Sequence, residues 1–325
     1  MARTRLRGEA TTMAATLVAN KRLHASDGSG SLQEFIRTMQ ANPGYSAGIS
    51  FDMRYGVDPY NSGAITLPGL LDDVLTELGD LASRSNIKHY GFLNAMALPR
   101  FLNFPSTAIR ESIPKLRKLQ AADGSSKIVV ALGGMNYTNF TDWITYYEPT
   151  LLHLSSVETM MTDKLCAAAP PTVWSTTSTI FTSIERVSRY LLDSQTYPEK
   201  LYMGVSFEMG VNLYQLTETD TPIESAPYAP CDQFTQVGYE QVCDPHVKLQ
   251  ILDDIVVESG VILDYVFFYD SWDTMKKKVD GLLKLNLRKN IAWLLYNTHF
   301  SDSPWTCGSS LDRERKLRDY LASKT

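Results

Sequence analysis

The stretch KIVVALGGMNYTNF, residues 127–140, decides how the chain is expected to fold. Its first half is a short, unbroken run of β-branched and aliphatic residues, which is typical of a strand buried on both faces. Two glycines follow directly, where a strand ends and the chain turns. The stretch therefore predicts a strand of a parallel sheet, because helices cover both faces of such a sheet.

The segments on either side of this strand alternate between strand and helix patterns. Upstream, residues 47–51 and 90–97 have strand character. The apolar spacing predicts helices over residues 70–81 and 109–119. Downstream, further helices and strands are predicted at residues 180–192, 201–207, 265–269, 274–285, 291–296 and 312–321. This alternation predicts a parallel sheet or barrel with right-handed crossovers.

Composition and charge exclude several classes of protein. The chain has 325 residues, 44% of them hydrophobic and 21% charged, which suits one barrel-sized domain or two small ones. The net charge is −5 and the basic residues are scattered, so no nucleic-acid partner is expected. No apolar run approaches the ~18 residues of a membrane span. The five histidines are isolated, so neither a metal site nor a cofactor is indicated.

The N-terminal residues contain no convincing signal peptide. The start is positively charged, but the apolar segment after it is short and interrupted by Thr, Asn and Lys. Residues 1–44 are polar and irregular apart from a short helical pattern at 32–39, and they are predicted to form an extension. Four cysteines are too few for a disulfide scaffold, and two sequons, at Asn136 and Asn139, matter only if the chain is exported.

Four blocks of the sequence resemble blocks of the glycoside hydrolase family 18 chitinases, in that family's order. Residues 127–140 are similar to its third barrel strand, which usually ends in Gly-Gly-Trp-Asn. PEKLYMGVSFEMG, residues 198–210, resembles the seventh-strand block. GYEQVCD, residues 238–244, is similar to part of the small α/β insertion found in many members. Residues 269–295 are similar to the block that ends in the eighth strand.

The resemblance implies a fold, a compartment and a class of ligand. The fold is an α/β barrel of the (β/α)₈ type, formed by residues 45–208 and 270–325, with an α/β insertion subdomain at 209–269. The resemblance also implies that Cys243 pairs with Cys307 and that the protein is extracellular. Its implied partners are chitin or other glycans that contain N-acetylglucosamine. The oligomeric state is not indicated.

The barrel is expected to be incomplete, because the chain between two of its strands is too short. SVETMMTDKL, residues 156–165, resembles the family's sixth strand, and it begins only about 25 residues after the third strand ends near Leu132. A barrel uses about 30 residues for each strand–helix unit, so about two units, nominally the fourth and fifth, are predicted to be missing. The remaining sheet is expected to be open, distorted or six-stranded, with residues 145–154 as one candidate to cover its exposed edge.

The missing fourth strand is the one that carries the family's catalytic signature, Asp-x-x-Asp-x-Asp-x-Glu. In that family the Glu protonates the glycosidic oxygen while an Asp steadies the substrate's own N-acetyl group. No other acidic cluster replaces this signature. Residues 253–258 have helical spacing, 218–224 lie in a loop rich in Thr and Pro, and 270–273 resemble the N-cap turn of a helix. No catalytic residue is therefore predicted.

Six positions are nevertheless candidates for carbohydrate binding. They lie where family residues are matched or replaced near strand ends: Trp293, Asp163, Met135, Asn136, Glu208 and Tyr296. Trp293 matches a Trp that forms the floor of the sugar site in relatives, and its ring would either stack on a pyranose or belong to the core. Met135 replaces a family Trp, whereas Asp163 is retained. Glu208 is the only carboxylate that the resemblance places at a barrel strand end.

These features predict a chitinase-like protein that is inactive or severely impaired as a hydrolase and that binds chitin or N-acetylglucosamine oligosaccharides. Two alternatives remain open at this point. One is an active chitin hydrolase that uses an atypical acid, for which Glu208 is the candidate. The other is a non-functional splice form or gene-prediction fragment of a chitinase, from which the fourth and fifth strands have been lost.

Overall fold

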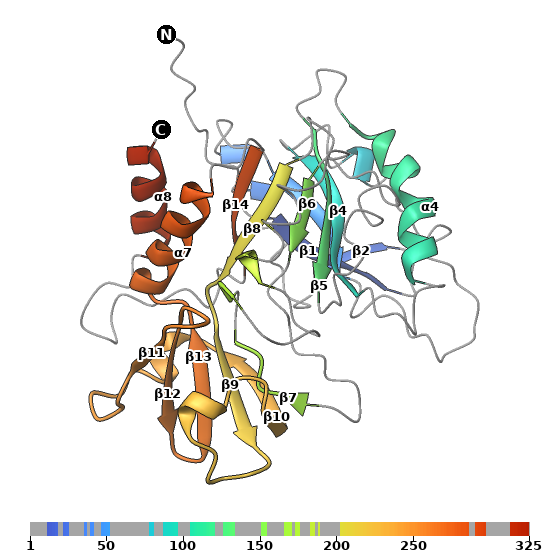
Figure 1. Ribbon diagram of the computed structural model, residues 1–325. Coiled ribbons are helices and arrows are strands. Elements are labelled where there is room, and N and C mark those ends of the chain that lie inside the picture. Colours follow the sequence, from blue (N-terminus) through green and yellow to red (C-terminus); the bar gives the residue numbers. More distant parts are fainter. Residues whose placement is uncertain are drawn as a thin grey trace. The chain divides into compact units, whose positions relative to one another are not determined.

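The chain forms two compact units, each of which is described separately (Figure 1). The computed structural model describes residues 12–18, 22–25, 36–37, 40–41, 47–52, 78–80, 87–96, 105–120, 126–133, 151–154, 166–170, 173–175, 183–185, 188, 202–285, 290–296 and 313–324. The first unit comprises Met1–Gly133, Asn139–Leu154 and Tyr197–Gly204, and the second comprises Gly134–Thr138, Ser155–Thr196 and Val205–Thr325. No described helix is both long enough and apolar enough to cross a membrane.

The first unit is built on a largely parallel sheet. Its strands are β1 (Thr12–Val18), β2 (Arg22–Ala25), β3 (Ala47–Asp52), β4 (Ile87–Met96), β5 (Ile128–Gly133) and β6 (Leu151–Leu154). β1, β3, β4, β5 and β6 pair in parallel, and β2 folds back on β1 as an antiparallel hairpin. Helix α4 (Pro105–Arg117) connects β4 to β5 and buries Ile113 and Leu116. The sheet core includes Ile49, Phe92 and Val130, which are inaccessible to solvent.

β5 is paired with a strand from the segment that was expected to cover the exposed edge of the sheet, residues 145–154. β6 pairs in parallel with β5, with Val129 opposite Leu151. The full strand order is β14-β8-β6-β5-β4-β3-β1-β2, where β8 (Tyr202–Glu208) begins in the first unit and ends in the second and β14 is Asn290–Tyr296. Over the described residues this sheet has two edges and does not close. The prediction of an incomplete barrel is therefore confirmed, while residues 156–165 lie outside the described residues.

The residues before position 45 contribute more structure than an extension would. β1 lies beside β3, with Met13 opposite Ile49, and β2 forms the edge of the sheet. The segment TMAATLV has a run of three small or unbranched apolar residues and a final Leu-Val pair without an alternating pattern, so its periodicity gives little sign of a strand. Strand formation by such a segment depends on the edge that it can pair with, which is a tertiary property.

The second unit contains an antiparallel six-stranded sheet, which we call the inserted sheet. Its order is β11-β12-β13-β9-β10-β7. The strands are β7 (Cys166–Ala167), β9 (Val211–Leu216), β10 (Pro230–Val237), β11 (Gln250–Leu252), β12 (Val257–Ile262) and β13 (Tyr265–Tyr269). Alternation gives the sheet two apolar faces. One face is centred on Tyr214 and Phe268, and the other on Val211 and Phe267.

Two features of the inserted sheet differ from the sequence-based expectations. Residues 250–262 form the β11–β12 hairpin rather than a helix, because Asp253 and Asp254 lie in a turn between two short strands. The apolar spacing there fits both periods over so short a segment. In addition, β7 joins the inserted sheet by pairing with β10, although it precedes residue 209 in the chain.

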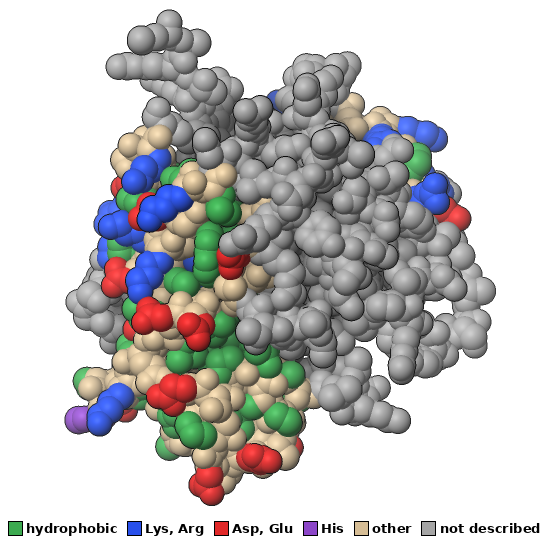
Figure 2. Space-filling view, viewed as in Figure 1, with side chains coloured by type: hydrophobic (Ala, Val, Ile, Leu, Met, Phe, Trp, Pro, Cys, Tyr) green, Lys and Arg blue, Asp and Glu red, His purple; other side chains and the backbone are tan. Residues whose placement is uncertain are grey.

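Two helices complete the second unit. Helix α7 (Trp272–Lys284) begins at Ser271, whose side chain accepts a hydrogen bond from the Thr274 backbone N–H, so the predicted N-cap turn is confirmed. Helix α8 (Arg313–Lys324) packs against α7. Lys and Arg side chains gather on the solvent-exposed faces of both helices (Figure 2). The exposed cations are Lys276, Lys277, Lys284, Arg315, Lys316, Arg318 and Lys324.

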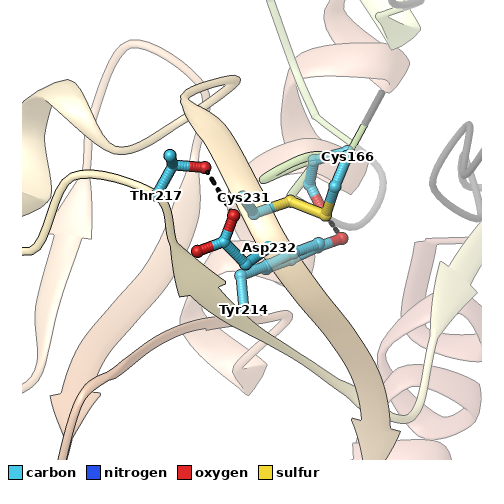
Figure 3. Close-up of a disulfide and its surroundings, with 6 residues drawn as sticks. Cys166, Tyr214, Thr217, Cys231 and Asp232 are labelled. Carbon is cyan, nitrogen blue, oxygen red and sulfur yellow. Dashed lines mark hydrogen bonds between the residues drawn. A yellow bond between two sulfur atoms is a disulfide. The ribbon is translucent and has the colours of Figure 1, made fainter. Parts of the chain in front are cut away.

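A disulfide between Cys166 and Cys231 fixes β7 to β10 (Figure 3). Beside it, the Tyr214 hydroxyl and the Asn212 side-chain amide both donate to the Ala169 carbonyl, at 2.7 and 3.2 Å. These contacts attach residues 166–170 to the inserted sheet. The sequence-based argument did not identify this pair, because an even cysteine count leaves the connectivity open.

Removing this disulfide is expected to lower the stability of the protein. In the Cys166→Ala/Cys231→Ala double variant the free energy of unfolding should fall by about 2–4 kcal/mol, since the bridge restricts a long loop in the unfolded chain. Urea denaturation of the two proteins measures the difference. Thr217→Ala is the matched control, because it removes only the exposed hydrogen bond to Asp232 beside the bridge and should cost less than about 1 kcal/mol. Equal urea midpoints for the double variant and the wild type would contradict the expectation.

Candidate functional site

The candidate site lies where β8 passes into the inserted sheet. Glu208 is the last residue of β8, and Met209 and Gly210 connect it to β9. Glu208 is only 1% exposed, and its Oε1 accepts a hydrogen bond from the Gly210 backbone N–H at 2.9 Å. A buried carboxylate needs such donors, because leaving it unpaired away from water is costly. The predicted site residue Glu208 is therefore a buried, locally bonded acceptor.

A short series of polar side chains continues from Glu208 along the inserted sheet. Asn212, which is 2% exposed, accepts a hydrogen bond from the Gln236 side-chain amide at 3.0 Å. Gly210 lies between these groups. A Cβ at Gly210 would lie 2.9 Å from Gln236 Cγ and 3.2 Å from Glu208 Oε1, so only glycine leaves room for both side chains. Glu208 and Gln236 thus approach the same short piece of backbone.

A buried ion pair lies at the second connection, where β13 leads into α7. Asp270 is fully buried, and its Oδ1 accepts hydrogen bonds from the Lys278 ammonium and, at 3.2 Å, from the Thr274 hydroxyl. Burial raises the pKa of Asp270, and Lys278 is the strongest of the groups that oppose this rise. Burial likewise lowers the pKa of Lys278, against the attraction of Asp270. Each charge is therefore held in the interior mainly by the other.

Arg313 joins the two connections. It is the first residue of α8 and is 1% exposed. Its Nη1 donates to the Asp270 carbonyl at 2.6 Å and its Nη2 donates to the Met209 carbonyl at 2.7 Å. The second unit therefore buries four charged side chains around these connections. Two are carboxyl groups, Glu208 and Asp270, and two are cations, Lys278 and Arg313. Within the described parts of the chain, no group of three or more His, Cys, Asp or Glu residues could hold a metal ion.

Trp293 is located in an apolar cluster beside β8. Its ring stacks on that of Phe207, with centroids 6.2 Å apart and planes 4° from parallel. The same cluster contains Met275 and Val279 of α7 and Leu317 of α8. Trp293 is half-buried, so it combines a packing role with some accessible surface. Stacking of its ring on a sugar stays a prediction.

The remaining predicted positions are not placed by the structure. Met135, Asn136, Asp163 and Cys307 lie outside the described residues, as does the side chain of Tyr296 at the end of β14. Cys243 is disulfide-bonded, as the resemblance implies, while its implied partner Cys307 is among those undescribed residues.

Three parts of this region were not predicted from the sequence: Asn212, the Asp270–Lys278 pair and Arg313. One signal was present for the ion pair. Lys278 occupies the buried stripe of α7 together with Thr274, Met275, Val279 and Leu282. A lysine on the apolar face of a helix requires a buried partner. Arg313 had no comparable signal, because its acceptors are backbone carbonyls.

Searches by sequence find no matching family model and no matching curated protein. Solved structures, in contrast, match the fold of this protein over nearly the whole chain. A group IV chitinase from Ostrinia furnacalis has a TM-score of 0.64 at 17% identity, covering 96% of this chain and 91% of its own. YKL-39, solved in the presence of chitooligosaccharides, has a TM-score of 0.64 at 14% identity, covering 95% and 91%.

A chitinase-like agglutinin from Robinia pseudoacacia has a TM-score of 0.56 at 16% identity, covering 95% of this chain and 93% of its own. At these identities the likeness concerns the fold. The matched structures include chitinases as well as an agglutinin that is described as chitinase-like. The chain has the α/β fold of glycoside hydrolase family 18 chitinases and chitinase-like proteins, in an incomplete form.

Proposed function

We propose that the protein binds oligosaccharides of the chitin type without hydrolysing them at the rate of an active chitinase. The observation that carries the proposal is that the two carboxyl groups near the strand ends are both buried and hydrogen-bonded within the protein. Glu208 is almost fully buried and accepts from the Gly210 N–H, and Asp270 is engaged by Lys278 and Thr274. A general acid must reach the glycosidic oxygen and give it a proton. Neither carboxyl group has that freedom.

Two further observations support binding over catalysis. The sequence contains no stretch that resembles the acidic signature of the fourth strand. Solved structures with this fold include YKL-39, which was crystallised in the presence of chitooligosaccharides, and the Robinia agglutinin. Solved structures with this fold are thus linked to sugar binding as well as to chitinases. Trp293, with its accessible surface, is the proposed stacking platform.

Isothermal titration with chitotetraose tests the proposal. The wild-type protein should bind, and Trp293→Ala should weaken binding at least about tenfold, because it removes about 1.4 kcal/mol or more of ring-stacking and apolar contact. Trp272→Ala is the matched control. Trp272 is also half-buried in the same cluster, but it lies on α7 against Tyr320, so its loss should change stability more than affinity.

Circular dichroism at the titration temperature establishes that each variant is folded. Absence of binding by the wild-type protein would refute the proposed function. Equal affinities for the wild type and Trp293→Ala would remove Trp293 from the site while leaving binding intact.

A further inference from the structure

The two connections of the inserted sheet share one guanidinium group. The continuous part of this sheet, from β9 to β13, is entered through Met209–Gly210 and left through Asp270–Ser271. These segments are far apart in sequence, yet the Met209 and Asp270 carbonyls accept from the two terminal nitrogens of Arg313, at 2.7 and 2.6 Å. A planar guanidinium can bridge two carbonyls in this way because its N–H groups diverge in a fixed fork. A lysine ammonium has no equivalent geometry.

The position of Arg313 is costly for an arginine. It is the first residue of α8, where the helix dipole disfavours a positive charge, and it is almost completely removed from solvent. A buried cation needs compensation. Part of it comes from the Asp270 carboxylate, whose pKa Arg313 helps to lower. The two carbonyls contribute further compensation, so a shift of either connection weakens the contacts that hold the side chain there.

We infer that Arg313 is a positioning residue that fixes the two connections of the inserted sheet and, through Met209, the Glu208 carboxylate. Met209 lies between Glu208 and Gly210, the two residues joined by the Oε1 hydrogen bond. Moving the Met209 carbonyl therefore moves both ends of that bond. This effect on the connections does not depend on the proposed function.

Hydrogen exchange measured by mass spectrometry tests the positioning directly, without a ligand. Arg313→Lys keeps the positive charge but cannot donate to both carbonyls in the geometry of a guanidinium group. It should raise backbone amide hydrogen exchange at least about tenfold in the peptides that cover residues 205–212 and 266–272. Exchange in the rest of the β9–β10 hairpin, residues 213–237, should stay unchanged. Arg318→Lys is the matched control on α8, because Arg318 is exposed and pairs with its neighbour Asp319. This variant should leave both connections protected.

Unchanged exchange in the two connections, or a uniform rise across residues 205–285, overturns the positioning role. Raised exchange confined to the connections supports it even if the wild type fails to bind sugar, a result that would refute only the proposed function.

Discussion

Replacing Lys278 with methionine is expected to lower the free energy of unfolding by about 3–5 kcal/mol, the largest single effect on stability that the structure suggests. The variant leaves Asp270 in the interior without its main counter-charge, with both side chains of the pair fully inaccessible in the wild type. Chemical denaturation monitored by tryptophan fluorescence gives the difference. Lys277→Met is the matched control, because the neighbouring Lys277 pairs with Asp253 in solvent, and it should cost less than about 1 kcal/mol.

The pH dependence of this variant follows from the pKa of Asp270. Burial already raises this pKa, and removing Lys278 removes the strongest opposing group. A carboxyl group whose folded pKa is raised is favoured in its protonated form, so the folded protein is penalised at neutral pH and relieved as the pH falls through the raised pKa. The stability deficit of Lys278→Met should therefore shrink on acidification.

A second substitution separates loss of the counter-charge from loss of packing. Adding Asp270→Asn to Lys278→Met should recover part of the stability at neutral pH, because the uncompensated carboxylate is then absent. The amide oxygen can still accept from Thr274. A double variant as unstable as Lys278→Met alone would show that the charge on Asp270 is not the cause.

Hydrolysis of a fluorogenic chitobioside is expected to be slower than that of an active chitinase by about 100- to 10,000-fold or more, the range that a general acid contributes. The Ostrinia furnacalis group IV chitinase, which shares the fold, is a suitable enzyme for comparison under identical conditions. Any residual rate should be the same in Glu208→Gln, because Glu208 is buried and already hydrogen-bonded.

Rapid hydrolysis that depends on Glu208 would contradict this expectation. Turnover within about tenfold of the comparison enzyme, lost in Glu208→Gln, would make Glu208 an atypical acid. A buried carboxyl group can serve in that role when its surroundings keep it protonated. Such a result would leave the fold unchanged and overturn the proposed lack of hydrolysis.

Local sequence patterns predicted several elements of the second unit well. The strand predicted at residues 265–269 is β13, with the same bounds, and the last two predicted helices correspond to α7 and α8. These elements have strong sequence signals. An unbroken aromatic and aliphatic run predicts a strand, and an apolar stripe at helical spacing predicts a helix, and both patterns lie within a single segment. The Ser271 cap is also local, since its hydrogen bond spans only three residues.

Elements that depend on distant partners were not predictable in the same way. The β11–β12 hairpin was assigned helical spacing, although its residues pair across a turn. β7 is only two residues long and exists by pairing with β10, to which the Cys166–Cys231 bridge also ties it. In each case the deciding contact comes from another strand, so the segment alone carries no decisive preference.

The sequence by itself determined that a buried parallel sheet would form, that the barrel would be incomplete, and that Glu208 would lie at a strand end. Only the tertiary structure decided that β6 lies directly beside β5 and that Arg313 joins Met209 to Asp270. The physical reason is the range of the interactions. Apolar periodicity is set within one element, whereas strand pairing and a bridge between two carbonyls require segments that only folding brings together.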